Sequence, residues 1–479
     1  MAQNTYPGPL TDKNISAIFE GAADFLRRRL QCGIHTLYAY GIDGLISSAD
    51  ASDYIFKPIT EHLHGENMEA LYQGALRGEV YNCVADACQD LDTVALKLVN
   101  GFCVVLFPGV GAIAFEVRIG VARSPGAPEV ENTVKGPKDA FVETMRINTG
   151  LVRRHLRSPE LRLYGTQIGE RSLTNVSVVW LEGITNRELV QKMKERLASI
   201  RIDGLLSPAS VEEYVTGSRR TAFPLLQYTE RTDRFCQGIL AGQVGLLIDG
   251  LPLGYLAPVD LGGLMESQED RGMDYVSASC IRVLRYGALL LSLLLPGFFI
   301  ALTAFQQEMI PLPLLKAIIE SRQSVPFSTA VEVLGLLIAF ELLQESGIHL
   351  PQAIGQSVSV IGGIVVGTAA VEAKLISPAA LIAVSIAGVC GFVQPNRDLA
   401  EAVRVWRFAL AVLGALAGLF GVTVGVLALL IHLSGLTSLG VPYLAPFARG
   451  EAPKLLRYRL KDQKFRPARY RPEDGRNQQ

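Results

Sequence analysis

The chain has 479 residues, which is long enough for two or three domains of ordinary size. Its formal net charge at pH 7 is −1, and this excludes a binder of polyanions such as nucleic acid as a description of the whole molecule. Charges occur throughout the sequence up to about Ser279, whereas long apolar stretches dominate from Tyr286 to Phe447. We therefore predict a soluble N-terminal half followed by a membrane-embedded C-terminal half.

The N-terminal residues Met1–Asn14 are polar and contain no apolar core of a signal peptide, so we expect the soluble half to stay in the cytoplasm. The seven cysteines are scattered and include no CxxC pair, which fits buried free thiols better than disulfides. Six dispersed histidines add no set of side chains with the spacing of metal ligands. We predict neither a metal site nor a cofactor.

Two pairs of similar segments indicate that the soluble half is a duplication. Ile34–Gly41 resembles Val176–Gly183, because each is a β-rich run that ends in glycine. Val104–Ile119 resembles Gly245–Val259, because each has two apolar strands around a glycine turn. The members of both pairs are separated by nearly the same number of residues, about 142. We predict two related α/β domains, each with a mixed sheet covered by helices.

These patterns divide the chain into four predicted parts. Residues 1–145 and 146–280 form two cytoplasmic α/β domains, 281–450 form a transmembrane helical domain, and 451–479 form a basic cytoplasmic tail. The tail follows the last hydrophobic helix, and a basic run at that position marks a cytoplasmic end more often than a nucleic-acid site. We therefore expect no nucleic-acid partner.

A glycine-rich segment after an expected strand imitates a dinucleotide-binding fingerprint. Gly109-Val-Gly111-Ala-Ile-Ala114 has the GxGxxA spacing, but that fingerprint must open a helix whose N-terminus receives the pyrophosphate. The continuation Phe115–Ile119 alternates like a strand, so we interpret the glycines as a hairpin turn. The sequence has no P-loop, nucleophile elbow or HExxH motif, and we predict that the protein is not an enzyme.

The segment Lys138–Arg157 has the pattern of an amphipathic helix. Phe141, Val152 and Leu156 lie on one face, whereas arginines that include Arg153 lie on the other. One interpretation is a solvated helix surface. The other is a contact with a second protomer or with the membrane, and the residues leave both open.

Four stretches are long and apolar enough to cross a bilayer, which needs about 20 residues. They are Tyr286–Phe305, Gln352–Val371, Ile376–Gln394 and Trp406–Ser434. A fifth stretch, Val331–Leu343, is too short to span comfortably, so we expect it to be re-entrant or interfacial. Arg282 and Arg285 precede the first span, and with the basic tail they indicate that both ends are cytoplasmic. Both ends inside requires an even number of crossings, and four is the simplest count.

Polar and small residues recur on one face of the span Gln352–Val371. They are Gln352, Gln356, Ser359, Gly363, Val366 and Ala370. Exposure of two glutamines to lipid is costly, so this face meets protein in a helix contact or water in a pore. Glu341 is a second candidate. At membrane depth we expect it to attract cations or to hold two helices together, and the alternative is a glutamate at the membrane interface that is exposed to water.

Five specific runs resemble the spore germination A-subunit family in that family's own order, and together they extend over nearly the whole chain. They are VKGPKDAFVETMRINTGLVRRHLR (Val134–Arg157), FQQEMIPLPLL (Phe305–Leu315), VPFSTAVEVL (Val325–Leu334), LPQAIGQSVSVIGGIVVGTAAVEAKLISP (Leu350–Pro378) and LLIHLSGLTSLGVPYLAPFA (Leu429–Ala448). The family includes germinant-receptor A subunits and stage V sporulation relatives, and these runs do not separate the two groups.

The resemblance implies a multi-pass protein of the spore inner membrane of Firmicutes. It implies two partners, a permease-like B subunit that receives the nutrient and a lipoprotein C subunit. It also implies self-association into a ring that conducts monovalent cations after nutrient sensing, and this favours the pore interpretation of the polar face.

Two alternatives of other classes stay open. One is a secondary transporter, although the hydrophobic half contains no inverted repeat and few spans for a carrier. The other is a membrane scaffold or signalling subunit that does not conduct ions.

Overall fold

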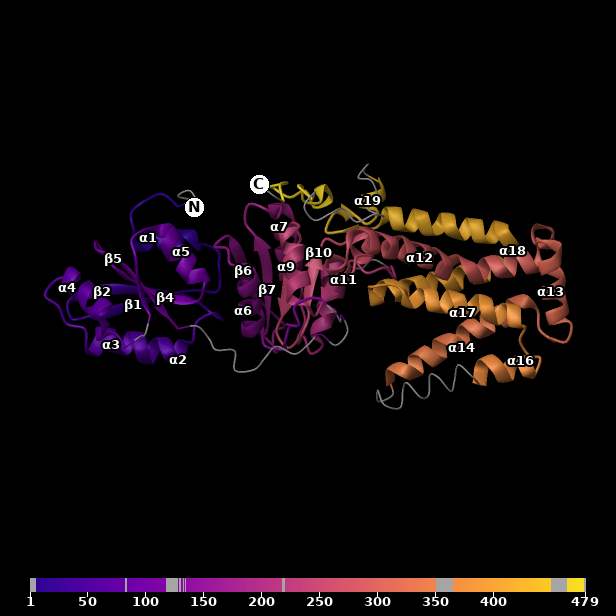
Figure 1. The fold of residues 1–479 in the computed structure, drawn as a ribbon, viewed down its shortest axis with the longest axis horizontal. Helices are drawn as coiled ribbons and strands as arrows, with labels where there is room; N and C mark the ends of the chain where they lie inside the picture. Colours follow the sequence, from indigo (N-terminus) through magenta and orange to yellow (C-terminus); the bar gives the residue numbers. More distant parts are fainter. Residues whose placement is uncertain are drawn as a thin grey trace. The chain divides into compact units, whose positions relative to one another are not determined.

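The computed structural model describes residues 6–81, 84–117, 128, 131, 133, 135–217, 220–349, 365–448 and 463–477. The chain forms two compact units, coloured along the sequence in Figure 1. The first comprises Met1–Ser218, Leu226–Pro258 and Gln463–Gln479, and the second comprises Arg219–Leu225 and Val259–Asp462. The first unit contains the two larger β-sheets, and the second is mainly helical.

The first sheet has five strands in the order β1-β2-β4-β5-β3, and every neighbouring pair is antiparallel. The strands are β1 (Phe25–Cys32), β2 (His35–Ile42), β3 (Ala85–Cys88), β4 (Phe102–Phe107) and β5 (Gly111–Glu116). All six residues of β4 are buried, because successive side chains point to opposite faces and helices cover both.

Helices α1 (Asp12–Ile18) and α5 (Leu91–Val99) pack against one face of this sheet, where Val104 and Leu106 are buried. The other face is covered by α2 (Ser48–Ala51), η1 (Ser52–Phe56), α3 (Lys57–Glu61), α4 (Met68–Gly74) and η2 (Ala75–Glu79). Val105 and Phe107 belong to that second core. The continuous apolar run of β4 is therefore that of a strand buried on both sides.

The second sheet repeats the order of the first, as β6-β7-β9-β10-β8. Its strands are β6 (Leu161–Ile168), β7 (Thr174–Leu181), β8 (Gln227–Thr229), β9 (Val244–Ile248) and β10 (Gly254–Ala257). The helices of this domain are α6 (Met145–His155), α7 (Arg187–Ala198), α8 (Val211–Thr216) and α9 (Thr232–Leu240), with the short turn η3 (Pro208–Ser210). The prediction of two related α/β domains is confirmed.

Equivalent glycines occupy equivalent turns in the two domains. Gly109, between β4 and β5, has φ +81°, and Gly250, between β9 and β10, has φ +80°, a region that favours glycine. The turns that follow β2 and β7 are closed by Gly44 (φ +82°) and Gly183 (φ +77°). The predicted equivalence of Gly41 with Gly183 was therefore wrong, because Gly41 lies inside β2.

The sheets are antiparallel rather than mixed in the part of the chain that the structure describes. The alternation of strands and helices suggested parallel crossovers, but β3 and β8 return beside β5 and β10 in the antiparallel direction. The hairpins β1–β2 and β4–β5 are joined by short turns, which only antiparallel neighbours allow.

The predicted amphipathic helix is α6, and one of its arginines joins the two sheet domains. Arg153 is fully buried and binds the carboxylate of Asp24 through Nε and Nη2, each at 2.8 Å. A Cβ at Gly150 would lie 2.6 Å from the carbonyl oxygen of Gly44, so the two backbones touch. Arg153 therefore makes an intramolecular contact, which neither interpretation of this face had included.

The C-terminal residues 463–477 pack against the second sheet domain. Arg466 Nε donates to the carbonyl of Leu240 at 2.9 Å, and the amide of Glu473 donates to the carbonyl of Ile184 at 2.9 Å. Tyr470 and Arg469 are buried. This end of the basic tail is therefore a docked segment of the first unit.

The second unit is built around two long apolar helices, α12 (Tyr275–Ala304) and α18 (Arg397–Gly435), labelled in Figure 1. Among the described residues these two are long and apolar enough to cross a membrane. The other described elements are α10 (Leu261–Leu264), α11 (Glu269–Gly272), η4 (Gln307–Met309), α13 (Leu312–Arg322), α14 (Thr329–His349), η5 (Val365–Ala369), α16 (Ala370–Glu372), α17 (Pro378–Phe392), β11 (Thr437–Ser438), β12 (Val441–Pro442) and α19 (Ala445–Ala448), with η7 (Ala468–Tyr470) in the docked tail.

The helices differ from the predicted spans in their lengths. The first span, Tyr286–Phe305, is the C-terminal part of the 30-residue helix α12. The apolar run Val331–Leu343 lies inside α14, whose 21 residues make a helix about 31 Å long at 1.5 Å per residue. The run therefore lies within a longer helix, and its expected re-entrant or interfacial placement stays a prediction. Ile376–Gln394 corresponds to α17, which has 15 residues.

Helix α18 folds back on itself at Ala417–Gly418. Both residues have non-helical dihedral angles, and Gly418 has φ +62°. The rings of Trp406 and His432 lie 5.7 Å apart, whereas 26 residues of straight helix would separate them by about 39 Å. The predicted single span Trp406–Ser434 is therefore a hairpin of two helical legs. The predicted count of four crossings treated this stretch as one crossing, so that count no longer holds.

Glycines allow the close packing of this hairpin. A Cβ at Gly421 would clash with the carbonyl oxygen of Leu413 on the first leg. A Cβ at Gly414 would lie 2.6 Å from the carbonyl oxygen of Gly297 on α12. These two glycines therefore allow close helix packing.

Candidate functional site

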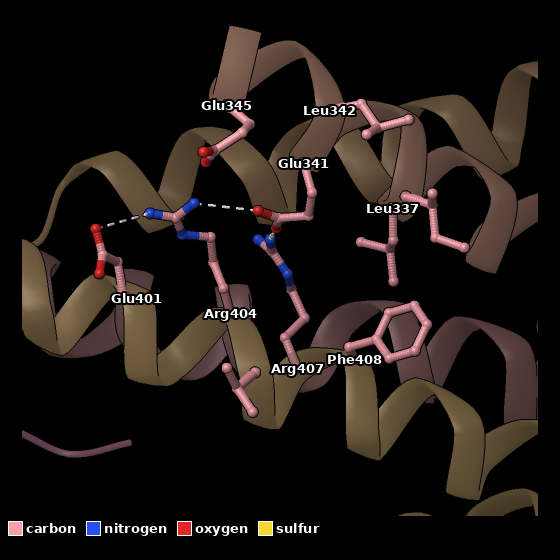
Figure 2. A pocket seen from close by; sticks show the side chains of 10 residues that line it. Leu337, Glu341, Leu342, Glu345, Glu401, Arg404, Arg407 and Phe408 are labelled. Atoms are coloured by element: carbon pink, nitrogen blue, oxygen red, sulfur yellow. Dashed lines mark hydrogen bonds and ion pairs between the residues drawn. The ribbon is translucent and has the colours of Figure 1, made fainter. Parts of the chain in front are cut away.

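An ion-pair cluster joins α14 to the first leg of α18 (Figure 2). Glu341 on α14 lies between two arginines of α18: its Oε1 is 2.6 Å from Arg407 Nη2, and its Oε2 is 3.1 Å from Arg404 Nη1. The side-chain oxygen of Gln344 accepts a hydrogen bond from Arg404 Nη1 at 3.0 Å. One carboxylate thus bridges two guanidinium groups.

The spacing of these residues along their helices explains why they meet. Glu341 and Glu345 are four residues apart on α14 and therefore share a face. Arg404 and Arg407 are three residues apart on α18, and Glu401 precedes Arg404 by three. Glu401 lies 3.6 Å from Arg404, so the first leg of α18 carries its own acidic partner.

Burial differs strongly between the members of the cluster. The side chain of Arg407 is 2% exposed, whereas those of Arg404 and Glu341 are 25% and 36% exposed. Arg407 Nη1 also donates to the carbonyl of Ala387 at 3.4 Å, so this arginine contacts α17 as well as α14. A guanidinium enclosed by apolar helices is costly without a counter-charge, and Glu341 supplies that charge.

The cluster borders a pocket of about 660 Å³ between α14 and α18. Its lining combines charged and apolar side chains: Leu337, Ile338, Glu341, Leu342, Glu345, Glu401, Arg404, Val405, Arg407 and Phe408. Leu342 and Val405 are largely exposed, so the apolar part of the pocket faces outward from the protomer. The arrangement has no nucleophile beside a general base, and it suits charge pairing rather than bond chemistry.

The described residues include no group of three or more His, Cys, Asp or Glu side chains that could hold a metal ion.

Two further buried carboxylates fix the ends of the helical bundle. Asp270 is fully buried and accepts from Arg285 at 2.7 Å and from Arg282 at 3.3 Å. These arginines, which precede the first predicted span, are both buried. Glu332, at the start of α14, accepts from the hydroxyl of Ser377 at 2.7 Å and so joins α14 to α17.

The predicted polar face is only partly within the described residues. Gln352, Gln356, Ser359 and Gly363 lie outside them. Val366 belongs to the short helix η5, and Ala370 opens α16 and is partly buried. Whether these six residues face one axis stays a prediction.

Sequence reasoning selected Glu341 but missed its two arginine partners. Arg407 lies inside the predicted span Trp406–Ser434, and a charged residue within an apolar run was the signal that could have identified it. Arg404 lies just outside that run, and its contact with Glu341 joins residues 63 positions apart.

Comparisons with known proteins bear on the whole chain. The family model described as Bacillus/Clostridium GerA spore germination protein matches residues 13–469. The chain is 32% identical to the uncharacterized membrane protein YfkQ of Bacillus subtilis (strain 168), over 92% of this chain and 86% of the relative. It is 30% identical to spore germination protein KA of the same organism, over 89% of this chain and 79% of the relative.

A solved structure is also similar to part of the chain. The crystal structure of the N-terminal domain of the A subunit of the Bacillus megaterium spore germinant receptor GerK3 aligns with a TM-score of 0.41 and 22% identity. The alignment covers 54% of this chain and 98% of that one.

Proposed function

Since this chain belongs to the GerA family of spore germination proteins, as a homologue of germinant receptor A subunits, we propose that it forms a nutrient-gated cation channel. The chain is a membrane protein of a family of receptor subunits, not of enzymes. The observation that carries the proposal is the family match over residues 13–469. In the proposed receptor, copies of this chain form a ring around a central pore for monovalent cations.

The candidate site supports a role for α14 in holding the pore together. Glu341 binds Arg407, which is almost fully buried, and thereby fixes the rotation of α14 against α18. Charged groups are costly inside a membrane bundle and mark functional positions there. The predicted polar face begins directly after α14, so the orientation of α14 bears on the direction in which that face points.

We propose that Gln352, Gln356, Ser359, Gly363, Val366 and Ala370 line the axis of the ring. Side chains at one level of a ring meet near its centre, where polar groups hydrate an ion and apolar groups restrict the radius. Under this proposal Val366 and Gly363 decide the narrowest radius.

The proposed setting is the spore inner membrane, with a permease-like B subunit and a lipoprotein C subunit as partners. We propose that both chain ends are cytoplasmic. The contacts of Arg466 and Glu473 with the second sheet domain support this, because a docked tail lies on the same side of the membrane as the domain that holds it. The division at residues 145, 280 and 450 also stays a proposal.

Potassium flux from liposomes that contain the purified full chain tests the channel. Val366→Ala widens an apolar constriction, so we expect at least tenfold faster release of potassium than from the parent. Gly363→Leu fills the axis, so we expect it to remove that leak when combined with Val366→Ala, while chemical cross-linking still detects the ring.

The alternatives give different results in the same assay. A non-conducting scaffold releases no potassium in any variant. A secondary transporter gives flux that saturates with ion concentration and needs a counter-gradient. Equal flux from the parent, Val366→Ala and Gly363→Leu proteins contradicts the assignment of this face to the pore.

A further inference from the structure

A short loop between two elements of the second sheet domain belongs to the second, mainly helical unit. The chain leaves the first unit after α8, passes through the second unit as Arg219–Leu225, and returns to the first unit just before β8. Within this loop Phe223 and Leu225 are 6% and 4% exposed. A connection between two elements of one domain ordinarily runs over that domain's own surface. This loop instead contributes to the core of the helical unit.

The loop contacts the second leg of the α18 hairpin through one histidine. Thr221 Oγ1 lies 2.9 Å from His432 Nε2, within hydrogen-bond distance. The ring of Phe223 lies 6.2 Å from that of His432. On its other side His432 lies 5.7 Å from Trp406 of the first leg. His432, on the second leg, therefore lies between the loop and the first leg of the hairpin.

The loop also contacts the segment that follows the hairpin. Ser438 Oγ donates to the carbonyl of Leu225 at 2.6 Å and accepts from the amide of Val259 at 3.0 Å. Phe223 lies 6.0 Å from Tyr443, which is fully buried. The carbonyl of Tyr443 accepts from the amide of Leu261 at 3.0 Å.

These contacts bring three segments of the chain into one packed core. They are the loop, the end of α18 with β11 and β12, and the segment from Val259 that leads toward α12. Displacement of the loop must disturb the base of both long apolar helices, because packed interiors do not deform continuously.

We propose that Thr221–Leu225 is a coupling loop through which the second sheet domain holds the membrane helices in their resting arrangement. This inference rests on the proposed channel function. The contacts of the loop belong to the arrangement that the structure shows. An interaction present in only one of two states stabilises that state, so loss of the loop contacts shifts the population toward the other.

The test measures potassium release from liposomes that contain the full chain. Phe223→Ala removes the ring that packs against His432 and Tyr443, and Thr221→Val keeps the side-chain shape but removes the hydroxyl. We expect both variants to release potassium at least tenfold faster than the parent. Thr221→Val is the milder variant, because it replaces only a hydroxyl by a methyl group at a partly buried position. A leak from this variant is therefore not explained by misfolding.

Phe107→Ala is the matched control, because it makes the same substitution at a fully buried phenylalanine in the core of the first sheet domain. It lowers stability without touching the loop, so we expect potassium release at the parent level. Circular dichroism of each reconstituted protein shows whether the fold is retained.

Val366→Ala separates failure of this inference from failure of the channel. If Val366→Ala leaks while Phe223→Ala and Thr221→Val do not, the coupling loop is refuted and the channel stands. If Phe107→Ala leaks as fast as Phe223→Ala, the leak reflects general instability and the inference is also refuted. If no variant leaks, including Val366→Ala, the proposed channel fails and the coupling role fails with it.

Discussion

Removal of the charge on Glu341 tests the candidate site most directly. Arg407 has 2% of its side chain exposed, and its Nη2 lies 2.6 Å from the Glu341 carboxylate. Glu341→Gln keeps the shape and one acceptor oxygen but leaves Arg407 as an uncompensated cation among apolar helices. Breaking a buried ion pair from one side costs about 3–5 kcal/mol. Because Glu341 is itself 36% exposed, we expect the lower limit of that range.

The assay is denaturant unfolding of the full chain in detergent. The chain has two tryptophans, so Trp180→Phe leaves Trp406, on the same leg of α18 as Arg407, as the fluorescent reporter. A loss of about 3 kcal/mol corresponds to a roughly 150-fold larger unfolding constant. Glu401→Gln is the matched control, because Glu401 lines the same pocket but is 50% exposed. Exposed ion pairs contribute about 1 kcal/mol or less, so this control should change little.

A double variant identifies the physical cause. Glu341→Leu with Arg407→Met removes both charges, and we expect it to recover at least half of the stability lost in Glu341→Gln, because no buried charge remains. If Glu341→Gln unfolds like Glu401→Gln, the guanidinium does not depend on Glu341 and the reasoning is refuted. If the double variant is no more stable than Glu341→Gln, packing rather than charge burial explains the cluster.

Three further predictions concern other parts of the chain. Burial raises the pKa of the Cys103 thiol to about 12, so iodoacetamide at pH 8 should modify the exposed Cys280 in the native protein and Cys103 only after unfolding, as mass spectrometry can show. A hydrogen bond with His155 holds the pKa of Asp139 below its ordinary value of 3.8, so this stabilisation is complete above that pH and is lost as the pH falls through the lower folded-state pKa. The stability difference between the parent and His155→Leu should therefore shrink on acidification below about pH 4 in thermal unfolding. Gly414→Leu should force the α18 hairpin away from α12, which a lower melting temperature in detergent would reveal, whereas Gly335→Leu, at a position with open space, should not.

The change from a charged N-terminal half to an apolar C-terminal half, and much of the local structure of the N-terminal half, could be predicted from the sequence alone. Hydropathy separates a charged half from an apolar half because water and lipid select different side chains. Gly109 and Gly250 could be assigned to hairpin turns because apolar alternation continues on both sides of each glycine and excludes a helix start. Family-specific runs also identified the family, since they extend in order over nearly the whole chain.

How the apolar segments fold and which charges meet could be seen only in the folded chain. The residues from Trp406 to Ser434 read as one span, because hydropathy does not register a reversal at two small residues. The fold-back at Gly418 becomes evident only when Trp406 and His432 lie side by side. Strand direction was similarly undetermined, since a helix between two strands can return the chain in either direction.

The partners of Glu341 lay beyond sequence reasoning for the same physical reason. Local patterns report residues three or four positions apart on one helix, whereas Arg404 and Arg407 approach Glu341 from a helix more than 60 positions later. Which of several charged residues becomes buried depends on how α14, α17 and α18 pack against one another. That packing is a property of the whole bundle, so only the folded chain could assign Arg407 to the interior and Glu341 as its counter-ion.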